Sequence, residues 1–149
     1  MAKNHEPKPE NLVLQEKYIA YSYYKQQIQV ASEELSTLSM TKHALNLAKE
    51  TLESMGSMKG SADVIVPIGA QVFAKAKLAD VKDVLVNIGG GVIVKKDVPA
   101  AIKSIEAEEK EVDAISEQLT AKLKEFSEKM GEAEADLEQY SAKMKEKEK

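Results

Sequence analysis

The chain has 149 residues with 5% aromatic and 31% charged residues, which is typical of solvated helices with narrow apolar seams rather than of a globular domain. The formal net charge is -4 and all 21 basic residues are lysine. Nucleic-acid-binding proteins concentrate positive charge and use the planar arginine fork, so this composition argues against nucleic acid as a partner.

The absence of cysteine excludes disulfides and thiol catalysis and fits a reducing cytosol. No apolar segment approaches the roughly 20 residues of a membrane span, and residues 1–10 are too polar for a signal peptide. We therefore expect a cytoplasmic protein that does not bind a membrane.

A heptad pattern dominates the first third of the chain. Residues 1–10 contain two prolines and few apolar groups, and are expected to be a disordered tail. A coiled-coil helix is predicted over residues 11–56, with Asn11 as its N-cap, and a linker over 57–63. Its apolar seam, broken at three lysines, comprises a positions Leu14, Tyr21, Ile28 and Leu35 and d positions Tyr24, Ala31, Leu38, Leu45 and Leu52.

Residues 64–96 have a different, β-like pattern. They hold short runs of β-branched residues bounded by glycine and by a polar turn, which predict two consecutive β-hairpins. The triplet Gly89-Gly90-Gly91 is expected to form the second hairpin turn, because it has neither the GxGxxG spacing nor the following helix of a phosphate loop. Four short strands leave unpaired edges, so we expect the insert to pair with other protein chains.

A second coiled-coil helix is predicted over residues 97–149, with Asp97 as its N-cap and Pro99 in its first turn. Apolar residues follow the 3,4 spacing for seven heptads from Val98 to Met144, interrupted at Glu109 and Ser116. The expected fold is therefore mostly α with a small β insert: a long antiparallel two-helix coiled coil with two β-hairpins at one end.

The two seams also predict a register. If the numbers of facing residues add to 154, each a position of one helix meets a d position of the other. The same register leaves polar layers at Lys42, Lys49 and Glu109, where the lysine stems are expected to extend out toward solvent. The facing pairs would be Leu14–Tyr140, Tyr21–Ala133, Tyr24–Met130, Ile28–Phe126, Ala31–Leu123, Leu35–Leu119 and Leu52–Ile102.

The insert resembles the signature of the prefoldin α class. The similarity is carried by Val66-Pro67-Ile68-Gly69-Ala70, by Phe73 with Lys75-Ala76, and by the run from Val84 to Val92 that leads to Lys95-Lys96. It covers the whole order of helix, two hairpins and helix. The glycine triplet and the lysine-only basic set depart from the family pattern and leave the assembly open.

The resemblance implies an archaeal-type prefoldin α subunit, a cytosolic chaperone that holds unfolded client proteins without nucleotide hydrolysis or a cofactor. In that family two α and four β-class subunits join their hairpins into a platform, and clients pass to a group II chaperonin. A sheet core within one subunit is the alternative for the insert, and the resemblance favours the intersubunit platform. The platform would use Val64, Val66, Ile68, Val72, Phe73, Val84, Val86, Ile88, Val92 and Val94.

The chain ends should meet at the far end of the coiled coil, which we call the tip. Ordinary seam packing is the plainer interpretation of each apolar residue there, but splayed helices would expose a small, adaptable patch for clients. Leu12, Val13 and Tyr18 lie off the strict seam and are the stronger candidates. The candidate client-binding residues are Leu12, Val13, Leu14, Tyr18, Tyr21, Leu137, Tyr140 and Met144.

Two other function classes fit the sequence less well. A homo-oligomeric scaffold or filament, assembled through the same hairpins, needs no β-class partner. An enzyme is disfavoured, because His5 and His43 lack nearby metal ligands and the glutamates from Glu106 to Glu111 lack a pocket. The sequence therefore predicts no catalytic, cofactor or metal site.

Overall fold

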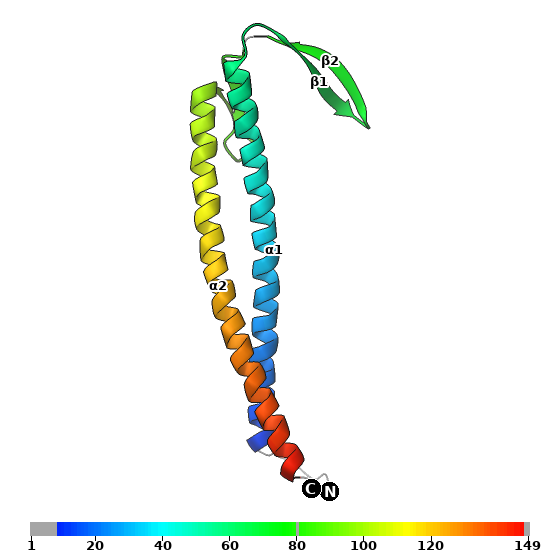
Figure 1. Cartoon of the computed structure of the whole chain (residues 1–149), viewed down its shortest axis with the longest axis vertical. Helices are drawn as coiled ribbons and strands as arrows, with labels where there is room; N and C mark the ends of the chain where they lie inside the picture. Colours follow the sequence, from blue (N-terminus) through cyan, green and yellow to red (C-terminus); the bar gives the residue numbers. More distant parts are fainter. Residues whose placement is uncertain (1–8, 80, 148–149) are drawn as a thin grey trace. The chain divides into compact units, whose positions relative to one another are not determined.

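The computed structural model describes residues 9–79 and 81–147, with side chains described over 12–79 and 81–143. The chain forms two long helices with two β-hairpins between them in sequence, as predicted (Figure 1). Helix α1 spans Pro9–Ser57 and helix α2 spans Val98–Lys147. The strands are β1 (Ala62–Gly69), β2 (Val72–Leu78), β3 (Asp83–Asn87) and β4 (Ile93–Asp97).

The start of α1 differs from the prediction. The helix begins at Pro9, so Asn11 lies inside it instead of capping it, and only residues 1–8 of the expected tail lie outside the described residues. Proline suits the first turn because its fixed φ is already helical and its missing N–H would have no intrahelical partner there. Asp97 is the N-cap of α2, as predicted: the backbone N–H of Ala100 donates to its Oδ1 at 2.7 Å.

The chain divides into two compact units, which we describe separately. Unit 1 combines the chain up to Leu38 with the chain from Ala114, and unit 2 is Ser39–Asp113. In unit 1 the two helices run antiparallel, and an ion pair joins Lys17 to Asp136. Ala31 and Ala133 are buried, and both are seam positions that the predicted register sets opposite large residues.

Cross-helix contacts agree closely with the predicted register. The ion pairs Lys17–Asp136, Lys42–Asp113 and Lys49–Glu106 join residues whose numbers add to 153, 155 and 155. The Tyr24 ring, expected beside Met130, lies 6.2 Å from the ring of Phe126, one turn away. An aromatic side chain is long enough to contact residues a turn from its own seam layer.

Unit 2 contains both hairpins. The pair β1–β2 is antiparallel with an irregular register between Pro67 and Gly69, and β3–β4 is antiparallel and regular. Val98, Ala101 and Val112 are buried at the α2 end of this unit. Among the described residues the buried core holds only small and medium side chains, and none of the large ones is fully buried.

The two hairpin turns are built differently. The first passes through Ala70 (φ 46°) and Gln71 (φ 63°), both in the left-handed region that L-residues other than glycine seldom adopt. The second uses the predicted glycine triplet, whose φ values are all positive. There the N–H of Gly89 donates to Asn87 Oδ1, and backbone bonds join Ile88 to Val92 and Val92 to Gly89, each at 3.0 Å.

Candidate functional surfaces

An apolar groove lies between the helices of unit 1, near the ends of the chain. It brings together three of the predicted tip residues, Leu14, Tyr18 and Leu137. Tyr18 is 62% exposed, as expected for a residue off the seam. The groove can receive an apolar side chain because most of its wall is carbon. Its full lining is Leu14, Gln15, Tyr18, Leu137, Glu138, Ser141 and Ala142.

The other predicted tip residues with described side chains do not line this groove. Leu12 is exposed, whereas Val13, Tyr21 and Tyr140 are half-buried. The ammonium of Lys143 lies 5.7 Å from the centre of the Tyr140 ring, so that ring presents one face to a cation. The side chain of Met144 falls outside the described part of α2.

The β1–β2 hairpin carries apolar side chains on both of its faces. Residues paired across an antiparallel ladder point to the same side, so Val64 and Val66 share one face with Ala74 and Ala76. Ile65 pairs with Lys75 on the opposite face and is 69% exposed. Of the predicted assembly residues here, Val64 is half-buried, and the exposed ones are Val66, Ile68, Val72 and Phe73.

The β3–β4 hairpin has one half-buried apolar face and one exposed face that also carries apolar residues. Val84, Val86 and Val94 share one half-buried face. The opposite face exposes residues that sequence reasoning missed, namely Leu85 (74% exposed) and Ile93. The unbroken apolar runs Val84-Leu85-Val86 and Val92-Ile93-Val94 were the available signal, since a strand with one solvated face alternates. Ile88 and Val92, both predicted assembly residues, are exposed beside the turn.

Unit 2 contains an apolar groove between helix α1 and strand β3. It is lined by side chains from both elements and by Ile105 of α2. Val84 and Val86 of the half-buried β3 face are among the residues that line it. Its helical wall consists of Ala44, Leu47, Ala48, Thr51, Leu52 and Met55, and its strand wall of Val84, Leu85, Val86 and Asn87.

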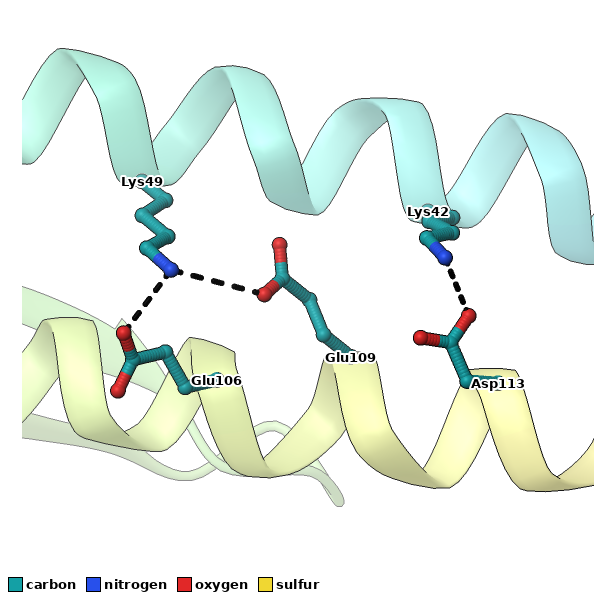
Figure 2. A network of polar contacts seen from close by, with 5 residues as sticks. All are labelled: Lys42, Lys49, Glu106, Glu109 and Asp113. Atoms are coloured by element: carbon teal, nitrogen blue, oxygen red, sulfur yellow. Dashed lines mark hydrogen bonds and ion pairs between the residues drawn. The ribbon is translucent and has the colours of Figure 1, made fainter.

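Lysines of α1 meet carboxylates of α2 in unit 2, and we call this group the lysine–carboxylate cluster (Figure 2). Lys42 forms an ion pair with Asp113. Lys49 Nζ lies 2.9 Å from Glu106 Oε1 and 3.9 Å from Glu109 Oε2. Lys42 is exposed and Lys49 is half-buried, and each ammonium is also held by a carboxylate across the seam, a pairing that the prediction did not include. Pattern reasoning on one helix missed Asp113 and Glu106 because both lie just beside the α2 seam.

The hydrogen bonds of this cluster shift pKa values in the direction expected for ion pairs. The hydrogen bond to Glu106 raises the pKa of Lys49, and the same contact lowers the pKa of Glu106. The hydrogen bond to Asp113 likewise raises the pKa of Lys42. One oxygen, Glu109 Oε1, is buried and accepts no hydrogen bond from any described residue.

The described residues hold no group of three or more histidine, cysteine or acidic side chains arranged to bind a metal ion. His43 is exposed, and His5 lies outside the described residues. None of the helices, over the residues described, is long and apolar enough to cross a membrane. The arrangement found is therefore one of apolar surfaces and ion pairs.

Comparison with known proteins gives one consistent result. Residues 24–143 match the sequence model of the prefoldin family, described as prefoldin subunit. The chain is 33% identical over 98 residues to prefoldin subunit alpha 1 of Thermococcus kodakarensis, covering 66% of this chain and 67% of the relative. It is 35% identical over 104 residues to prefoldin subunit alpha of Methanococcus aeolicus, covering 67% and 70%.

A solved structure shares the fold. The chain aligns with a TM-score of 0.70 and 24% identity to a cryo-EM structure of filamentous PFD from Methanocaldococcus jannaschii, covering 80% of this chain and 98% of that one. The element order, with two hairpins between two helices, is consistent with the family match, and so is the antiparallel pairing of the helices. The chain belongs to the prefoldin family and is similar to its archaeal α subunits.

Proposed function

We propose that this chain is an ATP-independent chaperone subunit that captures non-native proteins at the tip of its coiled coil and delivers them to a group II chaperonin. The observation that carries the proposal is the open apolar groove of unit 1, where Leu14, Tyr18 and Leu137 meet. An exposed chain segment gains free energy by burying apolar side chains there, and no bond needs to be made or broken. The proposed subunit is not an enzyme and uses no cofactor.

Assembly would occur through the hairpins, with β-class prefoldin subunits as partners in a complex of two α and four β-class chains. Exposed apolar residues on both faces of β1–β2, with open strand edges, support this proposal. Several arms in one complex would bind a single client with combined avidity, so each groove need bind only weakly. The absence of cysteine suits action in the cytoplasm.

Assembly with copies of itself, as a scaffold or filament, is the second candidate. It is favoured by the structural similarity to a prefoldin described as filamentous. Light scattering after size exclusion separates the two candidates, using the chain alone and mixed with a β-class subunit. A defined complex of about six chains that forms only in the mixture supports the chaperone assembly. A large self-assembly that ignores the β-class subunit supports the filament.

Client capture is tested by suppression of aggregation of a chemically unfolded protein. The assembled complex with Leu12, Val13 and Tyr18 changed to Ser is expected to lose most of its suppression. The matched control is Met40→Ser, which removes an apolar side chain of unit 2 that is more exposed than any of these three. Unchanged suppression by the tip variant, in a complex of unchanged mass, would contradict the proposal.

A further inference from the structure

Helix α1 has exposed apolar residues on the side away from its seam. Among the described helical residues, seven large apolar side chains are exposed on α1 and only one, Ile115, on α2. In a two-helix coiled coil the outward positions are ordinarily polar, because they face water. The outward face of α2 follows that rule, whereas the outward face of α1 does not.

Within unit 1 these residues are regularly spaced. Leu12, Ile19, Tyr23 and Val30 occupy the outward f and c positions of the heptads that place Leu14 and Tyr21 on the seam. The f and c positions from residue 12 to residue 33 follow the same 3,4 spacing as a seam and extend about 32 Å along the helix. We call this set the outer row: Leu12, Glu16, Ile19, Tyr23, Gln26, Val30 and Glu33.

The charges around the outer row all have one sign. At the outward and flanking positions (f, c, b and g) from residue 12 to residue 36, the charged side chains are Glu16, Glu33 and Glu34. The two lysines of this stretch are elsewhere on the helix: Lys17 pairs with Asp136 across the seam, and Lys25 lies 6.0 Å from the Tyr21 ring. The face is therefore apolar in its middle and acidic toward both ends.

We propose that the outer row is a docking site for a basic amphipathic α-helix of another polypeptide. The four apolar side chains of the outer row, spaced seven, four and seven residues apart, are matched by the apolar stripe of a helix, whose side chains interdigitate with them as in a coiled coil. Lysine or arginine beside that stripe would pair with Glu16 at one end and with Glu33 and Glu34 at the other. The outer row shares no residue with the lining of the tip groove; Leu12, at its end, is also a predicted client-binding residue.

A second copy of this chain is a poorer occupant on electrostatic grounds. It would present the same apolar residues, but its outward and flanking positions between residues 12 and 36 carry the same carboxylates and no lysine. Parallel pairing in register would place each glutamate beside its own copy, which is unfavourable. Charge complementarity thus selects a basic helix over self-association.

The test uses the full chain and a fluorescent 21-residue peptide with leucines at 3,4 spacing and lysines beside them. We expect binding by fluorescence anisotropy, with the peptide becoming helical by circular dichroism. The double variant Ile19→Gln/Val30→Gln should weaken binding about tenfold or more, because it removes two exposed apolar contacts. Ile115→Gln, which removes the exposed apolar side chain of α2 in unit 1, is the matched control and should leave the affinity unchanged.

Charge and conformation are tested with the same assay. A peptide with glutamate in place of its lysines should bind the wild-type chain weakly, and Glu16→Lys/Glu33→Lys should reverse this preference. A peptide with proline at its centre should not bind, since it cannot form the helix. The proposal is overturned by equal affinity for the lysine and glutamate peptides, by binding of the proline peptide, or by wild-type self-association that Ile19→Gln/Val30→Gln abolishes.

Discussion

The buried oxygen of Glu109 allows a quantitative prediction about the helix pair. Its side chain is 15% exposed, Oε2 lies 3.9 Å from Lys49 Nζ, and Oε1 accepts no hydrogen bond from a described residue. An unsatisfied buried polar group costs about 1–3 kcal/mol. Glu109→Leu removes that oxygen, and Lys49 keeps its closer partner Glu106 at 2.9 Å. We expect the free energy of unfolding to rise by about 1–3 kcal/mol.

The assay is urea unfolding of the full chain, followed by circular dichroism at fixed protein concentration. Glu108→Leu is the matched control: Glu108 is exposed on the same helix, so its substitution should change stability by less than about 0.5 kcal/mol. Lys49→Leu should be destabilising, because it leaves Glu106 and Glu109 without their cation. If Glu109→Leu is less stable than Glu108→Leu, the inferred cost of the buried oxygen is refuted.

Three further predictions concern stability. Gly131→Ala should raise the free energy of unfolding by about 1 kcal/mol, since Gly131 is helical and an added Cβ meets no atom within 4 Å; a loss in urea unfolding would contradict this. Replacing Ala70-Gln71 with Asn-Gly should raise the thermal midpoint, because both positions have positive φ and this pair favours such a turn; an unchanged midpoint would argue against strain there. The Lys49–Glu106 pair should stabilise the fold near neutral pH and lose this contribution as pH falls below the ordinary Glu value of 4.5 or rises above the ordinary Lys value of 10.5. The raised Lys pKa and lowered Glu pKa fix those signs, and unfolding of Lys49→Met across pH should lack this dependence.

The seam could be predicted from sequence because its period is a property of each helix alone. Ala31, Val98, Val112 and Ala133 were all assigned to the seam, and all four are buried. Ala101 was missed although it is fully buried. It lies one position from seam residue Ile102, near the junction where the backbone N–H of Val98 donates to the carbonyl of Lys82.

Features that depend on two segments together were harder to predict. The partners of Lys42 and Lys49 follow from the placement of α2, and no single-helix pattern specifies them. The left-handed pair Ala70 and Gln71 gave no signal, because neither residue favours positive φ. The outer row was visible in the sequence, but a search for a and d positions disregards the outward face.

The glycine turn of β3–β4 has a consequence for the order of folding. Its hydrogen bonds join residues within the short stretch from Asn87 to Val92, and a Cβ at Gly89, Gly90 or Gly91 would meet no atom within 4 Å. The positive φ angles of the glycines and these local hydrogen bonds therefore determine the conformation of the turn, and packing against the helices is not needed for it. Such a hairpin can close in about 1–10 μs. Nucleation at this turn can thus precede any encounter with another subunit, so a newly made chain can present a formed β3–β4 edge before its first collision with a partner.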